Sequence, residues 1–417
     1  MFGVDEFLKD SRELSKLGRF AIITNQSSLT TDKLSIVDAI SHKTQETPSK
    51  LVSVFGPQHG YFQTEQDNMI ETKDSEFVLS DGRTVPLYSL YSDSREPRLE
   101  QIKDLDCLIF DLQDIGCRAY TYMLTLALVL KQASKYSKKL ILLDRPNPIG
   151  LSHTDNGILK NVEGNTLEKN WESFIGWYEL PLRHGLTMGE LGKYFIQKDN
   201  LDIDYSVYNC QDLSRRHPQK IDQYGLYLPS PNIPKWESCF LFPSFVALEG
   251  TNISEGRGTT TPFQLIGSPF LNSHRCKDFL IANKSLYSYD QKKPSISISN
   301  HKFRPTFNKY KGEVCNGLYF HILDPNNIKT FHLGLLFLYF CCHEHPSSFE
   351  WLKPGYEYNF DTLPFKLIHG TNTWFNLLND LKERRSKLSV EDFIKDVDQK
   401  SSQARDFYNK TKDLHLY

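Results

Sequence analysis

The sequence has no strong imbalance of charge and no long apolar run, and both absences exclude classes of protein. Its 49 Lys and Arg residues nearly balance its 51 Asp and Glu residues, giving a net charge of -2, and no basic run is dense enough to follow a phosphate backbone. We therefore expect no nucleic acid partner. No apolar stretch reaches the roughly 18 residues of a membrane span, and residues 1–6 lack the basic-then-apolar order of a secretory signal. The chain is expected to be soluble and cytoplasmic, or periplasmic if a leader was removed from it.

The familiar signatures of metal, nucleotide and nucleophile sites are also missing. The eight cysteines show no C-x-x-C spacing and mostly lie in apolar runs, which indicates reduced cysteines in the core. Cys341-Cys-His-Glu-His345 could suggest a metal site, but adjacent side chains at a helix end do not easily face one ion. The chain has no G-x-S-x-G, no H-E-x-x-H, no Walker loop and no G-x-G-x-x-G after its first strand. We therefore predict no metal ion and no nucleotide cofactor.

What the chain does contain is a clear βαβ unit between residues 105 and 150. Two short apolar strands, 106–110 and 140–144, flank a predicted helix over 120–139, as is typical of a parallel sheet covered on both faces. In such sheets, ligands bind beyond the carboxyl ends of the strands. The polar residues at those ends are Asp111, Gln113, Asp114, Arg118, Asp144, Arg145 and Asn147. The alternative is that Asp111 and Asp144 only cap helices or tie loops together.

Further strands alternate with helices along the first part of the chain. Apolar runs at 20–24, 51–55 and 85–90 predict strands, and the polar stretch 61–82 is expected to be a long loop. This order predicts an α/β fold with a Rossmann-like, mostly parallel sheet in a domain over 1–268. Alternating strands and apolar helices then predict a second, smaller α+β C-terminal domain over 269–417.

Two glycine-rich loops carry further candidate residues. Gly56-Pro-Gln-His-Gly60 follows a predicted strand and presents His59, whose role is either structural or functional. The loop 248–259 holds two carboxylates, an amide and a guanidinium among three glycines, which suits a polar ligand. Carboxylates with amides and aromatic residues are what sugar recognition and glycosidic cleavage require.

Several motifs in this order resemble those of the exo-β-N-acetylmuramidase NamZ family. The motifs are Thr24–Gln26, Phe55–Gly60, Phe110–Arg118 with Tyr120–Tyr122, Leu143–Pro148, Arg183–Thr187, Pro229–Asn232 and Glu249–Thr259. The resemblance implies a glycosidase that removes terminal β-linked N-acetylmuramic acid from peptidoglycan fragments during cell wall turnover. It also implies a Rossmann-like domain, a smaller C-terminal domain, no nucleotide cofactor and a site in the crevice between the two domains.

The residues and the resemblance together give a set of expected site residues. Asp111, Asp114 and Glu249 are the candidate acid, base or charge stabiliser, and the acetamido group of the substrate could itself be the nucleophile. Arginine can bind the lactyl carboxylate through two parallel hydrogen bonds, and the candidates are Arg118, Arg145 and Arg257. For at least one of them, the alternative is an ion pair with Asp111 or Asp144. The other substrate-binding candidates are Asn25, Gln58, His59, Gln113, Tyr120, His184, Asn232, Asn252 and Glu255.

One residue departs from the family pattern. Where many relatives have Glu in the Gly-Pro-Glu-His-Gly loop, this chain has Gln58, whose amide cannot exchange a proton as a carboxyl does. Either another carboxylate takes this part, with Glu65, Asp67 and Glu71 nearby in sequence, or the protein is a catalytically impaired binder of muramyl sugars. A third alternative is a sugar-directed amidase or lactyl-ether hydrolase, for which no metal-ligand spacing is present.

Overall fold

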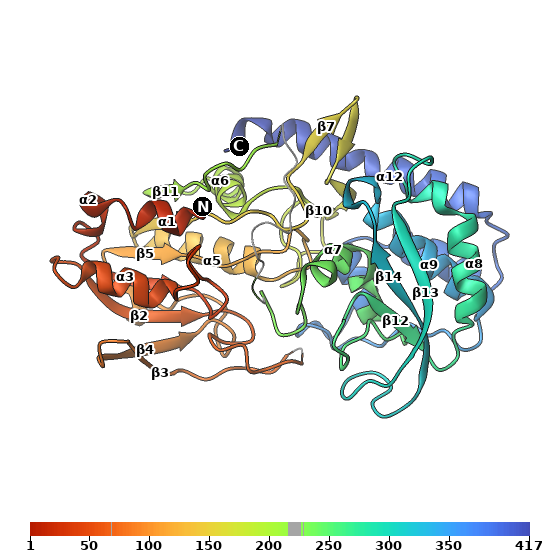
Figure 1. Cartoon of the computed structure of the whole chain (residues 1–417), viewed down its shortest axis with the longest axis horizontal. Coiled ribbons are helices and arrows are strands. Elements are labelled where there is room, and N and C mark those ends of the chain that lie inside the picture. Colours follow the sequence, from red (N-terminus) through yellow and green to blue (C-terminus); the bar gives the residue numbers. More distant parts are fainter. Residues whose placement is uncertain (68, 216–226, 228) are drawn as a thin grey trace.

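The computed structural model describes residues 1–67, 69–215, 227 and 229–417. Figure 1 shows an elongated molecule with a large sheet at one end and a smaller sheet at the other, joined by a helical middle. None of the helices in these described ranges combines the length and the apolar character needed to cross a bilayer.

The large sheet has seven strands in the order β11-β6-β5-β1-β2-β4-β3. All neighbours pair in parallel except β3, which runs antiparallel to β4 at the edge. The strands are β1 (Arg19–Ile23), β2 (Lys50–Gly56), β3 (Ser75–Val78), β4 (Thr84–Ser89), β5 (Cys107–Phe110), β6 (Lys139–Leu143) and β11 (Tyr205–Tyr208). The predicted Rossmann-like, mostly parallel sheet is therefore confirmed. The loop expected over 61–82 is wrong in one respect, because β3 lies within it.

Alternating residues of the central strands enter two separate cores. In β1, Ala21 and Ile23 pack into one core, whereas Phe20 and Ile22 pack into the other. The helices of this part of the chain are α1 (Gly3–Phe7), α2 (Ser11–Leu14), α3 (Ile36–Thr44), α4 (Leu99–Ile102), α5 (Tyr122–Lys135) and α6 (Met188–Asp199). Helices α1 and α3 contribute to the second core, and α5 and α6 to the first, so helices cover both faces of the sheet. Helix α6 begins with a capping box, in which the Thr187 hydroxyl accepts from the Glu190 backbone N–H and the Glu190 carboxylate accepts from the Thr187 backbone N–H.

The smaller sheet is antiparallel, in the order β12-β14-β13. Its strands are β12 (Leu265–Ser268), β13 (Ile296–Phe303) and β14 (Cys315–Ile322), and the helices around it are α7 (Trp236–Phe245), α8 (Ser273–Ala282), α9 (Thr330–Glu344), α10 (Pro364–His369), α11 (Thr373–Lys382) and α12 (Val390–Thr411). This is the smaller α+β part that the sequence predicts. The boundary predicted after residue 268 falls inside this sheet, because β12 before it pairs with β14 after it.

Short strands in the middle of the chain connect the two parts. They are β7 (His153–Asp155), β8 (Ile158–Lys160), β9 (Glu163–Thr166) and β10 (Pro181–Arg183). Glu163 of β9 accepts from the Phe331 backbone N–H at the start of α9 (2.9 Å) and also binds Arg183 (2.6 Å). One hydrophobic cluster runs from the large sheet through α7 and α9 to α12, so the two parts share a single core. All eight cysteines are free and buried, as the sequence predicts.

Candidate active site

A cavity lies beyond the carboxyl ends of β2 and β5, where side chains from both parts of the molecule meet. The lining residues named by the sequence prediction are Gln58, His59, Tyr120, Asn232, Glu249 and Arg257. Five polar lining residues were not named as candidates, and they are Thr121, Tyr122, Ser230, Tyr356 and Glu357. Apolar side chains complete the wall, among them Ile175, Phe242 and Phe263.

Glu249 is held in a buried network of opposite charges. Its side chain is only 5% exposed, and it accepts hydrogen bonds from Arg257 Nη2 (2.7 Å) and from the Tyr356 hydroxyl. Arg257 also lies 3.6 Å from Glu255, which forms a 2.8 Å ion pair with Lys309. Although burial opposes it, the two cations Lys309 and Arg257 hold the pKa of Glu255 below its ordinary value. These partners stabilise the negative charge of both carboxylates, and Glu249 is the one that faces the cavity.

Glu357 is a second buried carboxyl in the same wall. Its Oε1 accepts a hydrogen bond from Gln58 Nε2 (3.2 Å) and its Oε2 from the Tyr91 hydroxyl (2.8 Å). The orientation of the Gln58 amide is fixed by Thr121, whose hydroxyl donates to Gln58 Oε1 (2.6 Å). Burial and the neighbouring charge of Glu249 raise the pKa of Glu357 above its ordinary value, against the hydrogen bonds from Tyr91 and Gln58. The cavity therefore pairs a carboxylate bound by Arg257 and Tyr356 with a carboxyl whose surroundings raise its pKa.

His59 presents one defined ring nitrogen. Its Nδ1 lies 2.7 Å from the backbone oxygen of Glu65, which can only accept, so Nδ1 carries the hydrogen. Burial lowers the pKa of His59 to about 4, with Arg257 acting in the same direction. The imidazole is therefore neutral at pH 7, and its Nε2 can accept a hydrogen bond.

Hydrogen bonds to neighbouring loops fix the positions of other polar residues in the cavity wall. Asn232 donates to the Gln66 backbone oxygen (2.6 Å). Asn25 does not line the cavity but donates to the Tyr122 hydroxyl (2.9 Å), which in turn donates to the Pro229 backbone oxygen (2.9 Å). Asn25 thus acts on the cavity wall through Tyr122.

Asp111 and Arg145 lie apart from the described cavity lining. They form a buried two-point ion pair, with Arg145 Nη2 at 2.9 Å from Asp111 Oδ2, and Arg145 also donates to the Leu29 backbone oxygen (2.8 Å). The structure thus shows, for these two residues, the ion pair that the sequence left open as the alternative to substrate binding.

Arg118 is fully buried and its guanidinium is occupied by backbone. It donates to the carbonyl oxygens of Asn165 and Leu180 and, at the C-terminal end of α10, to those of Ile368 and His369. Burial lowers the pKa of Arg118 to about 10. Its donors are therefore directed at the seam between the two parts rather than at the cavity.

Asp114 and His184 form a buried pair behind the cavity. Asp114 Oδ2 accepts from the Gly116 backbone (2.6 Å) and lies 3.4 Å from His184 Nε2, while Asp114 Oδ1 has no hydrogen-bond partner among the described residues. Burial, Tyr122 and Asp114 together raise the pKa of Tyr120 well above its ordinary value. Asp114 therefore lies close to the Tyr120 part of the wall without being part of the lining.

The other predicted residues stabilise loops. Gln113 donates to the Asp114 and Pro146 backbone oxygens, and Asn252 bonds through both ends of its amide to the backbone of Ser348 and Glu350. These contacts are local and structural.

The sequence analysis missed Tyr356 and Glu357 because they lie in the C-terminal part, in a loop outside the motifs. The signal that could have identified them is a carboxylate between two tyrosines directly after Pro354-Gly355. Thr121, Tyr122 and Ser230 lie inside motifs that the sequence analysis quotes.

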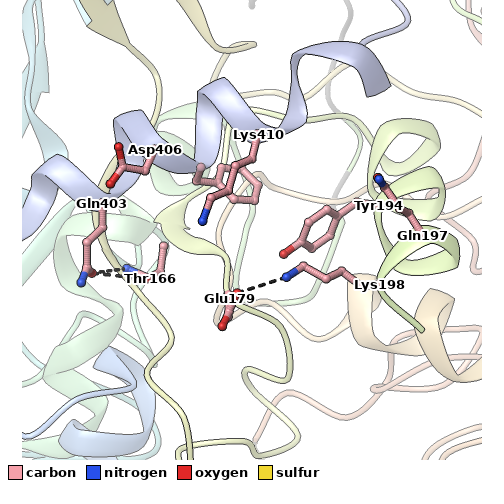
Figure 2. Close-up of a pocket in the computed structure, with 9 residues that line it drawn as sticks. Thr166, Glu179, Tyr194, Gln197, Lys198, Gln403, Asp406 and Lys410 are labelled. Carbon is pink, nitrogen blue, oxygen red and sulfur yellow. Dashed lines mark hydrogen bonds and ion pairs between the residues drawn. The ribbon is translucent and has the colours of Figure 1, made fainter. Parts of the chain in front are cut away.

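A second hollow lies between α6 and α12 (Figure 2). Its lining includes Lys198, Lys410 and Tyr194 together with two carboxylates, Glu179 and Asp406. Figure 2 shows Lys198 paired with Glu179, at 3.1 Å, and the side chains are 45% and 68% exposed. Both carboxylates of this hollow are exposed, so it offers no buried acid among the described residues. Across all the residues that the structure describes, no three His, Cys, Asp or Glu side chains are arranged to hold a metal ion.

Comparison with known proteins gives matches over nearly the whole chain. A family model described as "Exo-beta-N-acetylmuramidase NamZ, N-terminal" matches residues 20–237, and one described as "Exo-beta-N-acetylmuramidase NamZ, C-terminal" matches residues 240–417. The chain is 34% identical over 395 residues to the peptidoglycan beta-N-acetylmuramidase NamZ of Bacillus subtilis (strain 168), covering 93% of this chain and 88% of that protein.

Two solved structures of DUF1343 family proteins from Bacteroides fragilis NCTC 9343 share the fold, with TM-scores of 0.77 and 0.69. They are 26% and 23% identical in sequence, and each match covers 100% of this chain and 98% of the other. The family matches confirm the resemblance carried by the sequence motifs, and the chain belongs to the exo-β-N-acetylmuramidase NamZ family.

Proposed function

We propose that this protein is an exo-acting glycoside hydrolase that releases terminal β-linked N-acetylmuramic acid from peptidoglycan fragments. The observation that carries the proposal is the meeting of two buried carboxyl groups and one guanidinium, from Glu249, Glu357 and Arg257, in the wall of one cavity. The printed name of the Bacillus subtilis relative, a peptidoglycan beta-N-acetylmuramidase, supports the same substrate class.

Glu249 is proposed as the charged carboxylate of the reaction. Cleavage of a glycosidic bond develops positive charge at the anomeric carbon and ring oxygen, and a carboxylate beside the ring stabilises that charge. Arg257 and Tyr356 keep Glu249 in place and stabilise its charge, and Glu249 still lines the cavity. Glu249 can also orient the substrate acetamido group if that group attacks the anomeric carbon.

Arg257 is proposed to bind the lactyl carboxylate that distinguishes N-acetylmuramic acid from N-acetylglucosamine. Of the three arginines expected for this part, Arg118 donates to backbone carbonyls and Arg145 pairs with Asp111, and neither is among the described lining residues. Arg257 lines the cavity, where it also binds Glu249. Among the described lining residues, Arg257 is the one cation. His59, through Nε2, and Asn232, through its amide oxygen, are proposed to bind the sugar hydroxyl and acetamido groups, since both residues line the cavity and each binds a backbone oxygen through its other polar side-chain atom, a nitrogen.

Arg257→Met tests this assignment through the product. We expect the dissociation constant for N-acetylmuramic acid, measured by calorimetry, to rise about 10- to 100-fold, because charged hydrogen bonds are worth about 1.5–3 kcal/mol. The constant for N-acetylglucosamine should change less than about threefold, because it has no lactyl group. Arg275→Met, an exposed arginine on α8, is the matched control. An equal loss of affinity for both sugars would contradict the assignment.

The activity itself is tested with a chromogenic β-N-acetylmuramide, the matching β-N-acetylglucosaminide and purified muropeptides, with products identified by mass. Release of N-acetylmuramic acid from the non-reducing end is the expected result. Binding of muramyl sugars without cleavage would instead indicate an impaired binding protein, and loss of the lactyl group or the stem peptide would indicate another class of hydrolase. We place the reaction in cell wall turnover and in the cytoplasm, as the sequence predicts, and cell fractionation tests the compartment.

A further inference from the structure

We propose that Glu357 is the proton donor to the leaving oxygen, supplied to the cavity by the C-terminal part of the chain. The inference rests on the proposed function, because it assigns a step in that same reaction. It also resolves the question raised by Gln58, since a carboxyl group faces the position that the amide occupies.

The segment that carries Glu357 is fixed on both sides. Tyr356 donates to Glu249, and Tyr358 donates to Glu71 (3.2 Å) and to the Met69 backbone oxygen (3.3 Å). Glu357 and Tyr358 have φ values of 46° and 62°, a region that residues other than glycine occupy at a cost. Contacts with the first part of the chain hold the segment in this conformation, and as a result Glu357 lines the cavity beside Gln58.

The surroundings of Glu357 raise its pKa, chiefly because the residue is buried. The residue is 6% exposed, and Glu249 in the same wall contributes a negative charge. The opposing cation is Arg95, whose guanidinium is stacked over the rings of Tyr91 (4.0 Å) and Tyr358 (4.8 Å) and does not pair with Glu357 directly. Burial, together with the charge of Glu249, outweighs the hydrogen bonds from Tyr91 and Gln58 and the charge of Arg95, and raises the pKa of Glu357. A general acid needs to retain its proton near neutral pH until the transition state.

The Gln58 hydrogen bond lowers the pKa of Glu357, but it leaves one carboxyl oxygen available to carry the proton. Because Thr121 occupies the amide oxygen, the amide nitrogen faces Glu357 and can only donate. Oε1 of Glu357 is therefore an acceptor, and the proton belongs on Oε2 beside the Tyr91 hydroxyl, which can donate or accept.

The step balances without any further reactant. The Glu357 proton passes to the glycosidic oxygen as the bond between that oxygen and the anomeric carbon breaks, and the aglycone leaves as an alcohol. Glu249 stabilises the positive charge on the sugar. Water then adds its hydroxyl to the anomeric carbon, and its proton restores the acid form of Glu357.

Glu357→Gln tests the proposal by comparing a substrate whose leaving group needs a proton with one whose leaving group does not. On a disaccharide with a terminal N-acetylmuramic acid, whose leaving oxygen needs a proton, kcat/KM should fall by about 100-fold or more. On the 2,4-dinitrophenyl muramide, which leaves without protonation, the fall should be less than about tenfold, and the basic limb of the pH profile should disappear. Asp361→Asn, an exposed change nearby on the same loop, is the control for both substrates.

An equal fall on both substrates, or an unchanged basic limb, would overturn the assignment of Glu357. Wild-type protein that cleaves neither substrate would instead overturn the proposed function itself. If Glu357→Gln does not fold, Tyr91→Phe keeps the carboxyl while removing a hydrogen bond that lowers the pKa of Glu357. Its basic limb should then move to higher pH, and a limb that stays in place would contradict the proposal.

Discussion

Replacing Gln58 by glutamate is the most direct test of how the cavity handles its proton. In Gln58→Glu a second carboxyl takes the place of an amide nitrogen that lies 3.2 Å from Glu357 Oε1. Two unit charges at that distance repel by about 5 kcal/mol at an effective dielectric constant of about 20. Both groups therefore cannot ionise together, and the pair shares one proton at neutral pH.

The measurement is kcat/KM against pH for the wild type and Gln58→Glu, with a muramide that carries a poor leaving group. Because each pH unit corresponds to about 1.4 kcal/mol, we expect the basic limb of the variant to move upward by about two pH units after the side chains relax. Activity at neutral pH should be retained or increased, since the pair keeps a proton to donate. The Thr121 hydroxyl still has a carboxyl oxygen to bind, so the loop should stay in place.

Two results would refute this reasoning. An unchanged basic limb would mean that residue 58 does not share a proton with Glu357. If the wild type is inactive and Gln58→Glu is active, Glu357 alone cannot donate the proton, and the amide at residue 58 is the reason that the wild type does not cleave its substrate.

Three further predictions concern charged residues around the sheet and the cavity. Asp111→Asn leaves Arg145 buried without its counter-ion, so the free energy of unfolding measured with urea should fall by about 3–5 kcal/mol. The kcat/KM of the folded fraction should stay near the wild-type value. A loss of activity at unchanged stability would contradict a structural role for the Asp111–Arg145 pair. Burial raises the pKa of Asp144 to about 6, so the stability linked to its protonated form is present below about pH 4 and is lost as the pH rises through about 6. Asp144→Asn should therefore gain up to about 3 kcal/mol over the wild type between pH 4 and pH 8 in thermal unfolding, and an equal gain at both pH values would be inconsistent with this shift. Since the pKa of His59 is about 4, His59→Asn should lower kcat/KM but leave the shape of the pH profile between pH 5 and 8 unchanged, and the loss of a limb in that window would show that His59 titrates there.

The large sheet could be predicted because strands buried on both faces read as unbroken apolar runs. All four residues of β5, Cys107–Phe110, are buried, and so are the last four of β6. Strand β3 could not be predicted, since only Phe77 of its four residues is buried. Strand β12 is buried but contains only Leu265–Ser268, and its partner β14 begins at Cys315, a pairing that no local pattern indicates.

The candidate site could be predicted where a strand end or a glycine-rich loop presents polar residues. This reasoning named Gln58, His59 and Glu249 as site residues, and all three line one cavity. It could not decide whether a polar side chain at a strand end binds a ligand or another side chain, and Asp111 turned out to bind Arg145. Local sequence patterns could not identify Glu357, because it is 299 residues from Gln58 in sequence and a loop with positive φ values brings the two together.

The position of Arg118 has a consequence for how substrate reaches the cavity. A hinge movement that parts the two ends of the molecule would separate this guanidinium from the carbonyl oxygens at the end of α10. Each buried polar group left without a partner costs about 1–3 kcal/mol, and the charged donor costs more. The shared core between the sheets resists the same movement. The Arg118 contacts and the shared core therefore both oppose a hinge opening, and we expect a sugar chain to reach the cavity while the two ends of the molecule stay together.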